Sequence, residues 1–136
     1  MTPVTALQTA VVDALRASSA LAELIEDRVF DEVPGGVGGA YVYVGPANVQ
    51  RVNVGCGPVW NVRLRLFAVS NEFGRLQAWE QGQAIIEALD DTEPALPEPY
   101  VLVGPIIANQ GGDVIDPLAP KSVFVDLAAT VNAILP

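Results

Sequence analysis

The side chains that most often do chemistry are scarce in this chain. There is no histidine, and Cys56, which lies between two glycines, is the single cysteine. A cysteine nucleophile needs a base or a cation nearby, and Arg51 is the only cation close to Cys56 in sequence. Zinc and haem sites would lack their usual thiolate and imidazole ligands, and an intramolecular disulfide is impossible. The sequence therefore offers no activated nucleophile and implies no cofactor.

Two further motifs resemble binding sites only superficially. The glycines of GGVGG at 35–39 are not followed by the Lys-Ser/Thr pair of a nucleotide-binding loop, so we predict a connector. Asp90, Asp91 and Glu93 fall at the end of a predicted helix, next to prolines, where charged residues are usually solvated. A loosely bound cation is the alternative for these three carboxylates.

Composition and charge limit the class of protein. A chain of 136 residues has the length of one domain, and 51% hydrophobic content argues against disorder. The net charge is −9, and the seven basic residues are scattered, so a surface that grips nucleic acid is not predicted. No run of about 18 apolar residues is present, so a membrane span is not predicted. We expect a protein that is cytosolic or is assembled in the cytosol.

The segment Val59–Ser70 is the clearest strand, and it runs into an amphipathic helix. Its residues alternate, with one set facing the core and the other set facing a wetter side. The core set is Trp60, Val62, Leu64, Leu66 and Ala68, and the wetter set is Asn61, Arg63, Arg65 and Phe67. The helix from Arg75 to about Asp90 is predicted to turn Trp79, Gly82, Ile86 and Leu89 toward the core and Gln81 away from it.

The remaining elements complete a single α+β domain over 1–136. Thr2 is a predicted cap for a helix ending near Ala17, and Ser18-Ser19 can cap a second, shorter helix. A brief strand is predicted at 41–45, and the segment 46–58 is either a hairpin arm or a long loop. A linker is predicted at 92–99 and strands at 100–104 and 122–128, with 106–107 as a candidate continuation of the first. A loop is predicted at 109–120, and the apolar end, 129–136, is expected to dock on the core or on a neighbouring subunit.

Arg63 and Arg65 are the most informative charged pair. One interpretation makes them ordinary solvated residues of a sheet face, and the other makes them partners of acidic groups across a subunit interface. The tryptophans Trp60 and Trp79 are predicted to anchor the core rather than to form a ligand platform.

The order of elements resembles the tail-completion family of tailed bacteriophages, the tail-terminator proteins of the neck, which also occur in phage-like gene transfer agents. The resemblance is carried by ALAELIEDRVFDEVP at 20–34, YVYVG at 41–45, the strand and helix at 63–89, and SVFVDL at 122–127. It covers nearly the whole chain. The family often has a histidine or tryptophan ahead of the serine of the middle strand, where this chain has Phe67-Ala68-Val69-Ser70.

The resemblance implies an antiparallel or mixed sheet with helices packed on one side, in a virion component that is not an enzyme. It implies a hexameric ring that caps the tail tube protein, stops tail polymerisation, docks to a head–tail connector or stopper protein, and lets DNA pass without specific binding. From the net charge we expect an acidic lumen. Segments 35–39 and 46–58 could become ordered only on a neighbour. The candidate subunit-interface residues are Arg51, Val52, Val54, Arg63 and Arg65.

Two alternatives stay open at this point. The first is another neck protein, such as a connector or stopper, which would share the size and acidity of this chain. The second is a small-molecule binding domain, which would need a pocket with convergent polar groups. An enzyme is the least supported class, because catalysis would depend on carboxylates alone and none are arranged for it in sequence.

Overall fold

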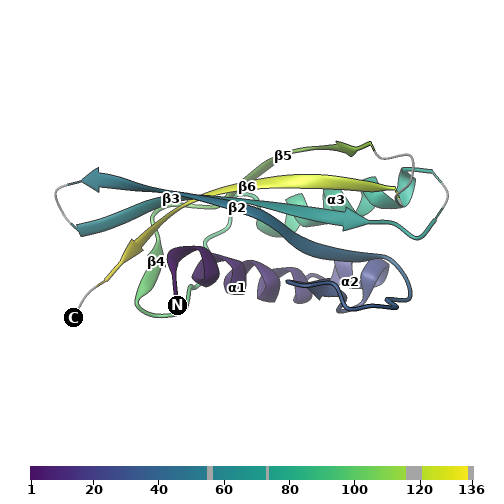
Figure 1. The fold of residues 1–136 in the computed structure, drawn as a ribbon, viewed down its shortest axis with the longest axis horizontal. Coiled ribbons are helices and arrows are strands. Elements are labelled where there is room, and N and C mark those ends of the chain that lie inside the picture. Colours follow the sequence, from purple (N-terminus) through teal and green to yellow (C-terminus); the bar gives the residue numbers. More distant parts are fainter. Residues whose placement is uncertain (55–56, 73, 116–120, 135–136) are drawn as a thin grey trace.

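The computed structural model describes residues 1–54, 57–72, 74–115 and 121–134. These residues form one α+β domain in which three helices lie on one face of a mixed sheet (Figure 1). The sheet order is β1-β2-β3-β6, and both β4 and β5 pair with the far side of β6. The elements are α1 (Pro3–Arg16), α2 (Ser19–Ile25), β1 (Val29–Phe30), β2 (Tyr41–Val54), β3 (Gly57–Val69), α3 (Leu76–Leu89), β4 (Tyr100–Leu102), β5 (Ile107–Val114) and β6 (Ser122–Ala133).

The N-terminal helices begin at the predicted caps. The Thr2 hydroxyl accepts a hydrogen bond from the Thr5 backbone N–H, and the Thr5 hydroxyl accepts one from the Thr2 N–H, so two otherwise unpaired donors are satisfied. Ser18 caps α2 in the same way through the Leu21 N–H. Both helix predictions are therefore confirmed. No helix within the described residues is long and apolar enough to cross a membrane.

The strand predicted at 41–45 is much longer than expected. β2 continues to Val54 and pairs antiparallel with β3 in register from Tyr41–Val69 to Val54–Gly57, so the described part of the segment, 46–54 and 57–58, belongs to a hairpin. A bulge between Val44 and Ala47 accommodates Pro46, which cannot donate to the ladder. Pro46–Val54 therefore forms a strand through contacts within one chain. In Figure 1 the hairpin extends to the left, beyond the helices.

The C-terminal third contains more strand than the sequence predicted. β5 occupies Ile107–Val114, so the first half of the loop predicted at 109–120 is a strand paired with β6. β6 continues to Ala133 instead of ending near Ala128, because its end pairs with both β3 and β4. The apolar end is thus largely part of the sheet. The linker at 92–99 is not helical, as predicted, and the second half of the predicted loop, 116–120, lies outside the described residues.

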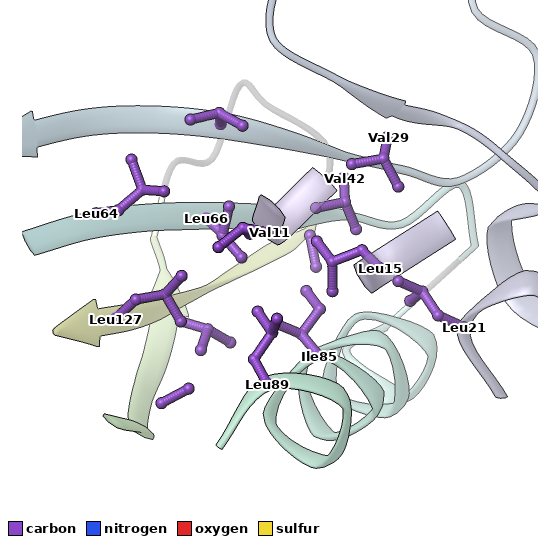
Figure 2. Close-up of a cluster of buried hydrophobic side chains, with 14 of the residues drawn as sticks. Val11, Leu15, Leu21, Val29, Val42, Leu64, Leu66, Ile85, Leu89 and Leu127 are labelled. Carbon is purple, nitrogen blue, oxygen red and sulfur yellow. The ribbon is translucent and has the colours of Figure 1, made fainter. Parts of the chain in front are cut away.

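The core lies between the sheet and the helices. Figure 2 shows side chains of α1, α2 and α3 pointing toward those of β1, β2, β3 and β6. The predicted core set of β3 is confirmed for four of its members, since Val62, Leu64, Leu66 and Ala68 are buried and Trp60 is half-buried at the rim. Full burial of a leucine side chain stabilises the fold by roughly 1.5–3 kcal/mol, so this alternation accounts for much of the sheet's attachment to the helices.

The face of α3 that meets the sheet differs from the predicted one. Gln81 is fully buried and Trp79 is 38% exposed, so the predictions for these two residues are wrong. Ile86 is half-buried and packs against the core, on the predicted side. The physical reason is that the Gln81 amide can donate to the Tyr41 and Val69 carbonyl oxygens where β2 and β3 meet the helix. Gly82 does face the sheet, where an added Cβ would lie 3.0 Å from Val123, so its predicted close approach is confirmed.

Candidate assembly surface

The surface most available for assembly is the face of the sheet opposite the helices, which we call the helix-free face. It is formed by the strand side chains that point away from the core, alternating with the buried set of β2, β3 and β6. Within the described ranges, no three His, Cys, Asp or Glu side chains are grouped as a metal site would require. The helix-free face is therefore described by its shape and charge.

One half of the helix-free face is aromatic. The rings of Phe30, Tyr41 and Tyr43 follow one another with centroids 6.0 and 6.2 Å apart, and Tyr43 stacks on Phe67 at 5.0 Å. Phe67 lies over Gly45 on the neighbouring strand, where any side chain would collide with its ring. The aromatic ring thus covers the strand backbone at the glycine, which has no side chain of its own.

The aromatic packing affects the Tyr43 hydroxyl. Burial raises the pKa of Tyr43 above its ordinary value of 10.0, and the neighbouring Tyr41 raises it further. Burial penalises the phenolate more than the neutral phenol, which explains the direction.

The middle of the face contains a bidentate ion pair between neighbouring strands. Arg65 of β3 donates to both carboxylate oxygens of Asp126 on β6, at 2.8 and 3.1 Å. Its guanidinium also lies 4.0 Å above the centre of the Phe124 ring. The hydrogen bond to Asp126 raises the pKa of Arg65 most, burial opposes this, and the charge of Asp126 adds to it. The acidic partner of Arg65 is thus in the same chain, whereas the interface interpretation placed it in a neighbouring subunit.

Arg63 lies two residues away in a shallow groove. The groove has a volume of about 410 Å³ and is lined by residues of β2, β3, β5 and β6, including Asn48, Ile107 and Ala128. Arg63 is exposed, and no acidic side chain pairs with it among the described residues. It is the cation of this face that remains available to a partner.

The other predicted interface residues lie on the hairpin arm. Val52 is opposite Val59 and shares the helix-free face with Arg63, whereas exposed Arg51 is opposite Trp60 and points to the helix side. Val54 pairs with Gly57 at the end of the hairpin. The structure therefore brings Arg63, Arg65 and Val52 to one face and separates Arg51 from them. Cys56 lies outside the described residues.

Charge is unevenly divided between the two sides of the molecule. The strands contribute Arg63, Arg65 and Asp126 to the helix-free face, which is a net charge of +1 from two cations and one carboxylate. The whole chain has a net charge of −9. The acidic residues are therefore concentrated in the helices and loops. Net charge read from the sequence could not reveal this division.

Sequence reasoning missed the aromatic half of the face and the two edges of the sheet. The aromatic row could have been found from the alternation of Tyr41 and Tyr43, with Phe67 and Phe124 at the equivalent positions of two other strands. The edges could not, because their identity depends on strand order, which the local pattern of residues does not specify.

Comparison with known proteins identifies the family. Residues 9–132 match the family model described as "Tail completion protein gp17". The chain belongs to this tail-completion family. It is therefore a structural component of a phage tail, as the resemblance implied.

A solved structure agrees with this assignment. A chain of a structure described as "Virion of native gene transfer agent (GTA) particle" superposes with a TM-score of 0.85 at 26% sequence identity. The match covers 95% of this tail-completion protein and 96% of that chain, so the two share one complete fold. No curated protein sequence matches at a significant level.

Proposed function

We propose that this tail-completion protein is the tail terminator of a phage or phage-like particle. Six copies form a ring on the head-proximal end of the tail tube, which ends polymerisation of the tube and joins the tail to the head connector. The protein is made and assembled in the host cytoplasm and stays in the neck of the particle. The main support is the family match together with a likeness, over 95% of the chain, to a chain of a gene transfer agent virion.

The two ends of the sheet support a ring rather than a two-fold dimer. One end is β2, with only the two-residue strand β1 beside its start, and the other end is β4 and β5. A contact between unlike surfaces on successive copies is heterologous, and it closes into a ring when the rotation per copy divides a full turn. A single domain with two different free sheet ends supplies both surfaces.

We propose that Arg63, Arg51, Val52 and Val54 contribute to contacts between subunits, with Arg63 pairing an acidic group of a neighbour. Arg65 contributes by where it lies on the helix-free face and not by pairing with a neighbour, because its guanidinium is already paired with Asp126 of the same chain. The exposed arm that contains Arg51, Val52 and Val54 extends beyond the helices, where it can reach an adjacent copy (Figure 1).

DNA would pass through the lumen of the ring without sequence-specific contacts. The lumen charge then depends on which surface turns inward, because the helix-free face has a small positive charge and the remainder of the chain is acidic. An acidic lumen, expected from net charge, requires helix-side or loop residues to line it. A lumen lined by Arg63 and Arg65 would contradict that expectation.

Deleting the gene from a particle-producing strain tests the proposal. We expect tails of irregular and excessive length that lack heads, and a plasmid copy of the gene should restore uniform tails. Loss of a connector or stopper protein should instead leave tails of normal length that are unattached. Normal-length tails in the deletion strain would therefore favour another neck role, and intact particles would contradict both.

A further inference from the structure

We infer that neighbouring copies in the ring join edge to edge, with the β2 segment 47–54 of one copy pairing antiparallel with β5 of the next. This inference rests on the proposed ring and specifies its joint. The occupant of each sheet edge is therefore a second copy of the same chain. Addition of a strand to an exposed edge is a common way for sheets to bind peptides and subunits, because backbone hydrogen bonds supply the affinity.

The β2 edge is long and largely unprotected. β1 pairs only with Val42 and Tyr43, and beyond them no described residue pairs with the outer side of β2. Proteins usually protect such edges with prolines, bulges or charges. Here Pro46 and the bulge lie at one end, and the segment 47–54 that follows has the single charge of Arg51 and a half-exposed Val49. An edge of this kind is suited to pairing.

The opposite edge of the sheet is β5, and it is held firmly in place. Its first part is occupied, because the Ala108 N–H donates to the Asp90 carboxylate at 2.9 Å. From 109 to 114, no described residue pairs with its outer side. Asp113 accepts hydrogen bonds from Trp79 of α3 and from Arg75, the N-cap residue of that helix, at 2.9 and 2.7 Å, which fix the strand to the helix. The second edge is thus six residues long and rigidly positioned.

Strand directions make the joint antiparallel. β2 is antiparallel to β3, β3 to β6, and β6 to β5, so β5 runs opposite to β2 within each copy. Rotation about the ring axis keeps the upward or downward sense of each strand along that axis. The β2 of one copy therefore meets the β5 of the next in antiparallel orientation, which is the more stable kind of ladder.

The two edges lie at different heights, and the difference suits a closed sheet. Segment 47–54 is level with 57–64 of β3, whereas 109–114 is level with 64–69 of β3 through β6. This offset of about six residues is about 20 Å at about 3.3 Å per residue. Four strands span about 19 Å at about 4.8 Å each, so the implied strand tilt is about 45°. Closed barrels have tilts of roughly 35–45°.

The direction of the offset places the helices outside. The β3-α3-β4 connection joins two parallel strands, and crossovers of this kind are almost always right-handed. When the sheet is viewed from the helix side with β3 running upward, the strands therefore lie in the order β2-β3-β6-β5 from left to right. Strands of a closed sheet coil in a right-handed sense, so from outside the copy on the right is shifted upward. Segment 47–54 of that copy then reaches the upper edge, β5, only if the helix side faces outward.

This arrangement makes a specific statement about the lumen. Six copies of four strands form a closed sheet of about 24 strands, wider than the 16–18-stranded barrels that already leave an aqueous channel. The helix-free face would line it, with Arg65 neutralised by Asp126 of the same chain. Because the strand side chains of this face carry a net charge of +1 per copy, the joint predicts a weakly positive lumen, in contrast to the acidic lumen expected from net charge.

Disulfide cross-linking in assembled particles tests the joint. We choose the register in which segment 47–54 and segment 109–114 are centred on each other and the helix-free face continues across the joint. In this register Val52 lies opposite Gln110 of the next copy, because both side chains point to the helix-free face. In a C56S background, V52C with Q110C should give a ladder of oxidised species up to six copies. The matched control, V52C with T130C, places the second cysteine on the interior strand β6 and should stay monomeric. Particles with tails of normal length but without the ladder would overturn the joint and leave the terminator role intact.

Hydrogen exchange on the unaltered protein covers the case in which the cysteine variants do not assemble. In wild-type particles the amides of 47–54 should exchange at least about tenfold more slowly than in the free chain, because their outward donors are paired in the ring. Equal exchange in particle and free chain would overturn the joint. The deletion phenotype tests the terminator role separately.

Discussion

The contact between Asp113 and α3 gives a prediction whose magnitude can be worked out. Asp113 is on β5, and its two carboxylate oxygens accept hydrogen bonds from Trp79 Nε1 and the Arg75 guanidinium. Substituting Asp113→Ala removes both. We expect the variant to fold, with β5 less firmly attached to the helix.

The expected loss of stability is about 1–2 kcal/mol. A hydrogen bond to a charged group contributes about 1.5–3 kcal/mol when buried, and the Asp113 side chain is 27% exposed, which favours the lower end. Arg75 is 66% exposed, so its ion pair adds about 0–1 kcal/mol at most. In a domain of this size the melting temperature should fall by about 3–8 °C.

Urea unfolding followed by far-UV circular dichroism measures the change, with Glu80→Ala on the exposed side of α3 as the control. A double-mutant cycle with Trp79→Phe, which removes the indole donor and keeps a smaller aromatic ring, isolates the Trp79–Asp113 coupling, expected to be about 1 kcal/mol. If Asp113→Ala unfolds like the Glu80 control, or if the coupling is zero, Trp79 does not fix β5 and the reasoning is refuted.

Four further predictions concern the fold. Leu66→Ala, at a fully buried site, should lower the free energy of unfolding by about 2–5 kcal/mol in urea titration, and a change below about 1 kcal/mol would contradict its central place in the core. Gly45→Val should destabilise by about 1–3 kcal/mol, and Phe67→Ala in the same chain should recover part of the loss, because the two side chains compete for one space. Ser18→Ala should lower the melting temperature through a loss of about 0.5–2 kcal/mol, while Ser18→Asp should not. Folding raises the pKa of Tyr43, so the neutral phenol contributes to the free energy of unfolding fully below pH 10.0, and this contribution is lost as the pH rises through the folded-state pKa. The variant Tyr43→Phe should therefore show a smaller fall in the free energy of unfolding at alkaline pH.

Much of the architecture could be predicted from local patterns. The alternation in β3 identified the core face of the central strand, and Thr2 and Ser18 identified the starts of two helices, because each of these signals depends on neighbouring residues alone. The same holds for Gly82, whose missing side chain on the apolar side of α3 indicated close helix–sheet packing.

The errors arose where distant segments decide the structure. The local pattern of 46–54 could not decide between a hairpin arm and a long loop, and the glycines of 109–114 suggested a loop. Pairing with β3 and β6 makes both segments strands, since tertiary contacts override weak local preference. Trp79 was placed in the core by its hydrophobicity, yet its indole N–H binds Asp113, which is 34 residues away. Arg65 finds Asp126 at a separation of 61 residues. Nothing in the sequence near either residue indicates its partner.

Reconstruction of the neck of the intact particle by electron cryo-microscopy tests the central claim most directly. We expect this chain in one ring of six copies, seated on the last ring of the tail tube and in contact with the head connector. Density for the chain within the connector itself, along the length of the tube, or nowhere in the mature particle would contradict its role as the tail terminator.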